Sequence, residues 1–366
     1  MAKLKIGIIG CGGIANGKHM PALAQHTDLC EITAFCDIIK ERAEKAAKDF
    51  GTADAKVYVN YKELLADKSI DVVHVLTPNV SHSEISVNAL EAGKHVMCEK
   101  PMAATSSDAQ KMMDAWKKSG KQFTIGYQNR LRPDVTALKK ACVAGELGDI
   151  YFAKGHAIRR RAVPTWGVFT NKEMQGGGPL IDIGTHALDL TLWMMDNYKP
   201  KSVTGSVFYK LGSLPHGPEG NMMGPWDPTT FEVEDSAFGM IKMENGANII
   251  LESAWAINLL ESREACTTLC GTLAGAEIKS AGFGQYDLTF NRAHNGVLTE
   301  EKISPGGSIP YASRGGDAVG ANEAKQWLEA IINDGTPLVQ PQQAFVVTQI
   351  LEAIYESSAT GKEVYF

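Results

Sequence analysis

The 366-residue sequence has no long hydrophobic run, no excess of basic residues and no regular cysteine framework. No stretch approaches the ~20 consecutive apolar residues of a membrane-spanning helix. The first residues show neither the apolar segment nor the cleavage site of a signal peptide. A formal net charge of -6 provides no general attraction to nucleic acid or anionic lipid. We therefore expect no nucleic-acid partner and no membrane partner.

The seven cysteines are odd in number and scattered, which argues against disulfides and favours a reducing cytoplasm. Cys266 and Cys270 lie four residues apart, but the second pair of ligands that a zinc site needs is missing. A metal site built from His156, Asp182 and His186 has no supporting spacing either. We expect no metal ion.

The chain is longer than one hydrophobic core usually serves, so two domains are expected. In the first part, strand-like runs alternate with helical segments, which is typical of a doubly wound parallel sheet. From residue 150 to residue 290, strand-like runs follow one another around a single clear helix, which indicates an antiparallel sheet. We predict domains at 1–130 and 131–320, with helices in 321–366 that pack back on them.

A glycine-rich turn follows the first apolar run of the sequence, Leu4 to Ile9. Gly10 permits a tight turn, Gly12 lets backbone approach a pyrophosphate, and the small Ala15 lets a helix pack on the strand. The next predicted strand ends in Asp37, whose carboxylate can accept hydrogen bonds from both ribose hydroxyls and would repel a 2′-phosphate. This pattern favours NAD over NADP as the cofactor.

Polar residues follow three further predicted strands, at the carboxyl ends where ligands of parallel sheets bind. They are Thr77-Pro78-Asn79, Glu99-Lys100-Pro101 and Tyr127-Gln128-Asn129-Arg130. The Lys100 ammonium can orient or polarise an alcohol oxygen, although a surface ion pair with Glu99 is the plainer interpretation. For Thr77-Pro78-Asn79 and His82, turn chemistry with a helix cap is the plainer interpretation and cofactor contact the stronger one.

The stretch Gly176–Asp189 predicts a helix whose opening turn carries reactive side chains. Three glycines form a loop that another molecule can approach closely, and Pro179 suits the first helical position. Asp182 and His186, four residues apart, share one helix face. A carboxylate beside an imidazole can handle protons, whereas a satisfied helix-end pair is the plainer alternative.

The segment from Gly212 to Thr230 is rich in glycine and proline and holds Trp226. A flexible connection would explain it. We hypothesise instead a lid or subunit contact near the substrate, because an exposed tryptophan suits the apolar face of a sugar.

The motifs in this order resemble the glucose-fructose oxidoreductase, inositol dehydrogenase and rhizopine catabolism family (Gfo/Idh/MocA) over nearly the whole chain. The motifs are Gly10 to Ala15, Thr77-Pro78-Asn79 with His82, Glu99-Lys100-Pro101, Gly176 to His186, and Val233-Glu234-Asp235. The resemblance implies a nicotinamide-dependent oxidoreductase of sugars, cyclitols or glycosides. It also implies an N-terminal Rossmann domain and a C-terminal open-faced antiparallel sheet through which members associate into homo-oligomers.

By the resemblance, the catalytic residues are Lys100, Asp182 and His186. The segment with Arg159, Pro164 and Trp166 resembles one that reaches the cofactor in the branch of levoglucosan dehydrogenase and the bacterial glycoside 3-oxidases. Together, the residues and the resemblance predict cofactor contacts from Gly10, Cys11, Gly12, Gly13, Ile14, Asp37, Thr77, Pro78, Asn79, His82, Glu99, Lys100, Asn129, Arg159 and Trp166. Substrate contacts are predicted from Lys100, Tyr127, His156, Asp182, His186 and Trp226.

We predict hydride transfer from a secondary ring hydroxyl of a sugar or glycoside to NAD, with C3 of a glucose-like ring favoured. His186 would remove the hydroxyl proton, because its unperturbed pKa of about 6.5 lies near working pH, while Asp182 orients the imidazole and Lys100 holds the developing alkoxide. One alternative is a glycosidase that acts by transient C3 oxidation and elimination. Another is a non-catalytic sugar-sensing Rossmann protein, which would not need these three residues together.

Overall fold

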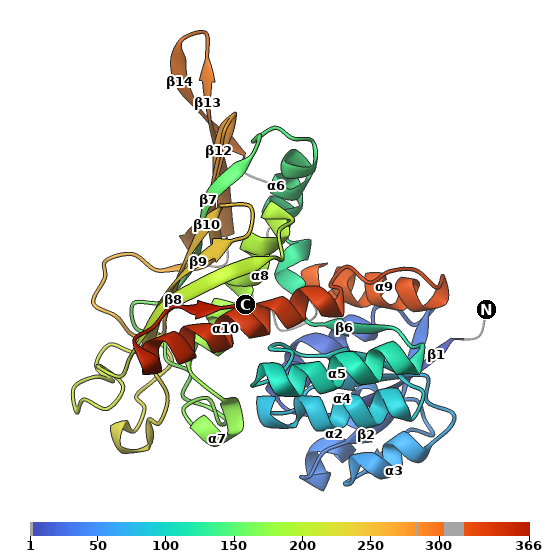
Figure 1. Ribbon diagram of the computed structural model, residues 1–366. Coiled ribbons are helices and arrows are strands. Elements are labelled where there is room, and N and C mark those ends of the chain that lie inside the picture. Colours follow the sequence, from blue (N-terminus) through green and yellow to red (C-terminus); the bar gives the residue numbers. More distant parts are fainter. Residues whose placement is uncertain (1–2, 283–284, 304–317) are drawn as a thin grey trace. The chain divides into compact units, whose positions relative to one another are not determined.

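The computed structural model describes residues 3–282, 285–303 and 318–366, which form two compact units (Figure 1). Unit 1 holds the described residues up to Gln128 and those from Ala318 to Phe345; unit 2 holds those from Asn129 to Ile303 and from Val346 to Phe366. The C-terminal helices are shared between the units. Helix α9 (Ala318–Ile332) belongs to unit 1, and α10 (Pro341–Thr360) passes from unit 1 into unit 2.

Unit 1 is built on a six-stranded parallel sheet with the order β3-β2-β1-β4-β5-β6, which confirms the predicted doubly wound fold. Its strands are β1 (Leu4–Ile9), β2 (Cys30–Cys36), β3 (Lys56–Tyr58), β4 (Val72–Val75), β5 (His95–Cys98) and β6 (Phe123–Ile125). Its helices before α9 are η1 (Ala15–His19), α1 (Met20–Leu23), α2 (Lys40–Phe50), α3 (Tyr61–Ala66), η2 (Asn79–Ser81), α4 (His82–Glu91) and α5 (Ser106–Ser119).

Successive side chains of β1 point to opposite faces of the sheet, and helices cover both faces. Ile6 and Ile8 are fully buried in one apolar cluster with residues of α1, α2 and α9. On the other face, a Cβ built on Gly7 would lie 2.9 Å from the Leu64 side chain of α3. This two-sided burial explains why the strands of unit 1 are almost wholly apolar.

The strand order places β1 beside β4, where the winding direction of the chain reverses. Ligands of such sheets bind at the carboxyl ends of the strands at this point. Gly10 follows β1 there, and Leu76 and Thr77 follow β4; the Leu76 N–H donates to the Ile9 carbonyl at 2.8 Å. The topology thus brings the glycine loop and the Thr77 segment to one edge of the sheet.

Unit 2 contains a nine-stranded sheet with the order β14-β13-β12-β11-β7-β10-β9-β8-β15. The predicted antiparallel sheet is confirmed with one difference: β7 and β10 run parallel, because α8 and two strands lie between them in the chain. The strands are β7 (Ile150–Ile158), β8 (Pro200–Phe208), β9 (Ser236–Met243), β10 (Asn248–Ala254), β11 (Arg263–Gly271), β12 (Ala274–Gly282), β13 (Gln285–His294), β14 (Val297–Ile303) and β15 (Val364–Tyr365).

Helices α8 and α10 pack against one face of this sheet. The segment η3 (Gln128–Leu131) spans the boundary between the units, and the remaining helical segments of unit 2 are α6 (Pro133–Val143), α7 (Lys172–Gln175), η4 (Leu180–Gly184), α8 (Thr185–Met195) and η5 (Pro228–Thr230). A Cβ on Gly155 would lie 3.2 Å from the Ala187 carbonyl of α8, and one on Gly239 2.5 Å from Ile354 of α10. Because strand side chains alternate, His156 and its neighbour Glu252 lie on the opposite face.

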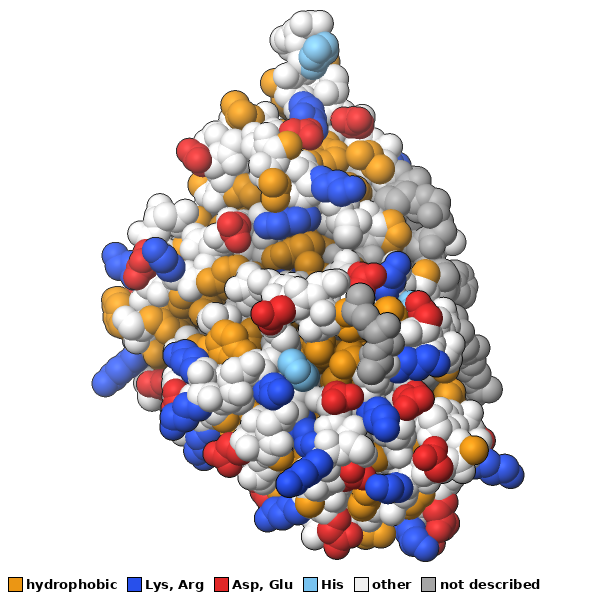
Figure 2. Space-filling model, turned by 90° about the vertical axis from the view of Figure 1, so that its right-hand side faces the viewer, with side chains coloured by type: hydrophobic (Ala, Val, Ile, Leu, Met, Phe, Trp, Pro, Cys, Tyr) orange, Lys and Arg blue, Asp and Glu red, His pale blue; other side chains and the backbone are white. Residues whose placement is uncertain are grey.

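The surface carries charged side chains of both signs. On the face drawn in Figure 2, basic and acidic side chains are interspersed, with hydrophobic side chains between them. Within the described ranges, no helix combines the length and apolar character needed to cross a membrane.

Candidate active site

The glycine loop after β1 is shaped to leave its backbone accessible. Gly10 has a φ of 93°, and a Cβ there would lie 2.5 Å from the Leu76 carbonyl oxygen, so only glycine fits. A Cβ on Gly12 or Gly13 would meet nothing within 4 Å, and Ile14 is 38% exposed. The loop leads into the π-helix η1. Open backbone before a helix start is the arrangement that a pyrophosphate needs.

Asp37 lies at the end of β2 and is tied to this loop. Its Oδ2 accepts the Cys11 backbone N–H at 2.9 Å, and its Oδ1 accepts the Ile39 N–H at 2.9 Å. An ionised carboxylate offers about four acceptor positions, so each oxygen retains capacity for a further donor. The residues of this loop therefore fit the dinucleotide that the sequence predicts.

The imidazole of His82 connects two of the predicted loops rather than facing outward. Its ring is fully buried, with Nε2 2.9 Å from the Thr77 carbonyl and Nδ1 2.8 Å from the Pro101 carbonyl. Burial lowers the pKa of His82 although both carbonyls raise it, so the ring is neutral and only one nitrogen donates at a time. Both partners are carbonyl oxygens, which only accept, so His82 donates to the Thr77 carbonyl or to the Pro101 carbonyl and not to both together.

Glu99 is also buried, at 5% exposed, and its Oε2 accepts the Lys100 backbone N–H at 3.0 Å. Tyr127, after β6, is 1% exposed, and Asn129 is 2% exposed. These three side chains are therefore buried rather than exposed at the surface.

In unit 2, the glycines of the Gly176–Asp189 stretch are surrounded by their own chain. A Cβ on Gly177 would lie 2.1 Å from the Tyr355 hydroxyl, and one on Gly178 would lie 2.3 Å from the Glu234 carbonyl oxygen. We predicted that these glycines allow another molecule to approach. The structure corrects this interpretation at both positions, because packing inside unit 2 already excludes a side chain there.

The helix predicted at Pro179 is present, but its first turn is a π-helix. Pro179 precedes η4, which contains Asp182, and α8 begins at Thr185 with His186 in its first turn. Single π-helical turns occur frequently at functional sites. His186 is 4% exposed.

Glu234 holds the start of this helix. Its carboxylate accepts the Gly178 N–H at 2.8 Å, the Leu180 N–H at 3.1 Å and the Tyr355 hydroxyl at 2.8 Å. Burial raises the pKa of Glu234, while these hydrogen bonds act in the opposite direction. A carboxylate at a helix N-terminus satisfies amides that have no partner within the helix.

Asp182 is held by Trp255, a fully buried residue directly after β10. The indole Nε1–H donates to Asp182 Oδ2 at 3.0 Å. Phe169 packs edge-on against Trp255 at 6.2 Å between ring centroids, and Trp166 against Phe169 at 5.9 Å. Trp166 is 56% exposed, so this row of aromatic rings leads from the surface of unit 2 to Asp182.

His156 does not belong to the group formed by Asp182 and His186. Ser253 Oγ donates to the Pro179 carbonyl at 2.7 Å, so the side chain of Ser253 lies on the face of the sheet that η4 covers. His156 pairs with Glu252, the residue before Ser253, and therefore lies on the opposite face. There its Nδ1 lies 2.9 Å from Glu252 and its Nε2 3.1 Å from Thr268 Oγ1. The three-residue metal site weighed above is therefore geometrically excluded.

Two further predicted residues have partners inside unit 2. Arg159 forms a bidentate ion pair with Glu264, with both N–O distances 2.6 Å. We expected Trp226 to be exposed, and this expectation is wrong: it is 7% exposed. Its Nε1–H donates to the Gly212 carbonyl at 2.7 Å and its ring packs on Phe231, so the indole forms the core of its own loop.

Known proteins are similar to this chain in sequence and in fold. Residues 4–127 match a family model described as an oxidoreductase family with an NAD-binding Rossmann fold, and residues 135–277 match the GFO/IDH/MocA C-terminal domain. The D-glucoside 3-dehydrogenase of Escherichia coli (strain K12) is 36% identical over 365 residues, covering 99% of this chain and 97% of the relative. The glucose-6-phosphate 3-dehydrogenase of Bacillus subtilis (strain 168) is 35% identical over 214 residues, covering 57% and 58%.

A solved levoglucosan dehydrogenase in complex with NADH and levoglucosan has a TM-score of 0.82 to this chain at 24% identity, covering 100% of this chain and 99% of the other. At that identity the likeness shows the fold. The predicted family, the Rossmann fold and the NAD cofactor are confirmed. The chain is a member of the GFO/IDH/MocA family of oxidoreductases, enzymes with an NAD-binding Rossmann domain.

Proposed function

We propose that this oxidoreductase oxidises a secondary ring hydroxyl of a sugar or glycoside, at C3 of a glucose-like ring. The observation that carries the proposal is the 36% identity to a D-glucoside 3-dehydrogenase over 99% of the chain. The 35% identity to a glucose-6-phosphate 3-dehydrogenase supports the same ring position. The half-buried carboxylate of Asp182 in η4 and the buried imidazole of His186 in the first turn of α8 supply groups suited to that chemistry.

In the proposed mechanism, bound NAD supplies the hydride acceptor. His186 takes the proton of the substrate hydroxyl, and Asp182 stabilises the imidazolium that forms. Trp255 keeps the Asp182 carboxylate in one orientation through its 3.0 Å hydrogen bond. Lys100 donates to the oxygen on which negative charge develops. The motif matches support this assignment of Lys100, Asp182 and His186 to one substrate hydroxyl.

The first test is turnover of methyl glucoside with NAD by the wild type and by His186→Ala. We expect loss of NADH formation in the variant with unchanged affinity for NAD, measured by titration. Full turnover by His186→Ala would refute the assignment of the base.

We also propose that the chain forms a homo-oligomer through the face of the unit 2 sheet that lies opposite α8. Phe208 is 37% exposed and Met240 42% exposed on that face, an apolar surface that a second subunit would cover. Sedimentation analysis of the wild type and of Met240→Lys tests this, with a larger monomer fraction expected for the variant. A cytoplasmic location is proposed because all seven cysteines are free thiols.

A further inference from the structure

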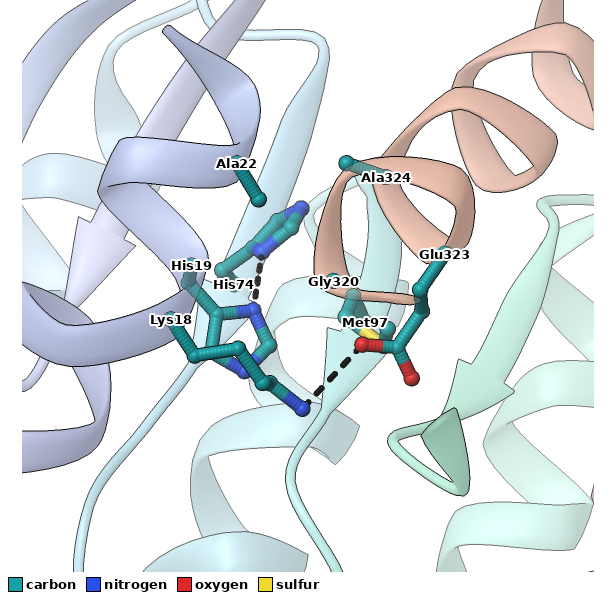
Figure 3. A pocket seen from close by; sticks show the side chains of 8 residues that line it. All are labelled: Lys18, His19, Ala22, His74, Met97, Gly320, Glu323 and Ala324. Carbon is teal, nitrogen blue, oxygen red and sulfur yellow. Dashed lines mark hydrogen bonds and ion pairs between the residues drawn. The ribbon is translucent and has the colours of Figure 1, made fainter. Parts of the chain in front are cut away.

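A buried cluster of charged and polar side chains surrounds Glu99, the residue before Lys100. Glu99 Oε1 lies 2.6 Å from Lys18 Nζ and 2.8 Å from His19 Nε2, and Glu99 Oε2 accepts the Lys100 backbone N–H at 3.0 Å. Lys18 and His19 belong to η1, which directly follows the glycine loop. Figure 3 shows Lys18 and His19 beside His74 around a small cavity. One carboxylate thus joins the glycine-loop helix to the Lys100 backbone.

The buried ammonium of Lys18 forms ion pairs with two carboxylates. Lys18 Nζ also lies 3.1 Å from Glu323 of α9, so one ammonium is shared by two carboxylates. Burial alone would lower the pKa of Lys18, but Glu323 and Glu99 raise it above its usual value. Burial alone would raise the pKa of Glu99, yet Lys18, His19 and Lys100 hold it well below its usual range. Both groups therefore remain charged at working pH.

The two histidines of the cluster have defined tautomers. Burial lowers the pKa of His19 to about 4 and also lowers the pKa of His74, so both rings are neutral at working pH. The carboxylate of Glu99 can only accept, so His19 Nε2 carries the proton. His19 Nδ1 then accepts from His74 Nδ1–H across 3.2 Å. Each hydrogen bond in the row from His74 to Glu99 thus runs in one direction.

We propose that Lys18, His19 and Glu99 are positioning residues that couple the glycine loop to the placement of Lys100. The inference rests on the proposed function, in which Lys100 acts on the substrate hydroxyl. A dinucleotide bound at the glycine loop would also fix the position of η1. The ion pair of Lys18 and the hydrogen bond of His19 would then fix the position of the Glu99 carboxylate. Glu99 in turn fixes the Lys100 backbone N–H. The position of Lys100 then depends on the position of the glycine loop.

The test compares Lys18→Met with Lys18→Arg, which keeps the charge, and with Lys45→Met, which removes an exposed lysine of α2 paired with Asp49. We measure the Kd for NAD by titration and kcat at saturating NAD and glycoside. We expect Lys18→Met to lower kcat about 10- to 100-fold with the Kd for NAD changed less than about 3-fold, since small misplacement of a reacting group has effects of this size. Lys18→Arg is expected to recover most of kcat, and Lys45→Met to behave as wild type.

An unchanged kcat in Lys18→Met, or a changed Kd alone, would overturn the coupling. If Lys18→Met does not fold, His19→Gln and His19→Leu give the same comparison, because glutamine retains an N–H donor for Glu99 and leucine does not. Equal kcat values for these two variants would overturn it as well. Absence of turnover in the wild type would instead refute the proposed function, so the two failures are distinguishable.

Discussion

The indole nitrogen of Trp255 donates a hydrogen bond to Asp182 across 3.0 Å, between residues 73 positions apart in the sequence. Replacement by phenylalanine retains a smaller aromatic ring beside Phe169 and removes the donor. We predict that Trp255→Phe lowers kcat about 10-fold and leaves the Kd for NAD unchanged, because the carboxylate that we propose stabilises the His186 imidazolium loses its fixed orientation. Trp116→Phe in α5 is the matched control. A wild-type kcat in Trp255→Phe would show that this hydrogen bond has no catalytic role.

The Tyr355–Glu234 hydrogen bond predicts a stability effect. Tyr355→Phe removes the 2.8 Å contact to a buried carboxylate, which costs about 1–3 kcal/mol of unfolding free energy. Urea unfolding monitored by circular dichroism measures the change. The exposed Tyr365→Phe is the control, for which we expect a change within about 0.5 kcal/mol.

A methyl group at Gly178 has no space. Its Cβ would lie 2.3 Å from a backbone oxygen of Glu234, which cannot move aside as a side-chain tip can. We predict that Gly178→Ala lowers the free energy of unfolding by about 2 kcal/mol or more. Gly17→Ala, whose Cβ would meet nothing within 4 Å, is the control and should change stability by less than about 1 kcal/mol. Equal unfolding midpoints for the two variants would contradict the steric account.

We expect the carboxylate of Asp37 to select NAD over NADP. Asp37→Asn keeps an oxygen acceptor of similar size beside the glycine loop but removes the negative charge that opposes a 2′-phosphate. We expect the ratio of kcat/KM for NAD to kcat/KM for NADP to fall about 10-fold or more in the variant, mainly through improved use of NADP. An unchanged ratio would mean that Asp37 does not select between the two cofactors.

The buried His19 predicts a pH dependence of stability. Its pKa is lowered to about 4 by burial, against 6.5 in the unfolded chain, so the unfolded state binds the proton more readily between these values. Its contribution to stability is therefore complete above pH 6.5 and is lost as pH falls toward 4. Between pH 7.5 and pH 5 this amounts to about 2 kcal/mol. The free energy of unfolding should be measured at both pH values for the wild type and for His19→Gln. We expect the decrease from pH 7.5 to pH 5 to be smaller in His19→Gln by this amount.

The parallel sheet of unit 1 and its NAD cofactor could be predicted from the sequence because their signals are local. The glycines at 10, 12 and 13 and the carboxylate of Asp37 follow strands whose apolar pattern is plain. The helix at Pro179 was also predicted correctly, since a proline and an apolar stripe are sufficient. Its π-helical first turn was not, because that turn depends on packing against β10 rather than on the local sequence.

The supporting residues could not be predicted, because each reaches its partner across a long sequence separation. Glu234 stands out in its motif, but nothing local links it to Tyr355, 121 residues away. Lys18 and His19 read as ordinary helix residues until Glu99, 80 positions beyond His19, is placed beside them. For Trp226, the local sequence led to a wrong prediction. Its glycine- and proline-rich loop suggested exposure, whereas the indole folds inward onto Phe231.

The most direct measurement is incubation of the purified enzyme with NAD and a nitrophenyl glucoside, following NADH absorbance and phenol release together and identifying the product by NMR. The proposed function predicts NADH formation in step with a 3-keto glucoside, no phenol release, and loss of both signals in His186→Ala. Phenol release without net NADH formation, or oxidation at a ring carbon other than C3, would contradict it.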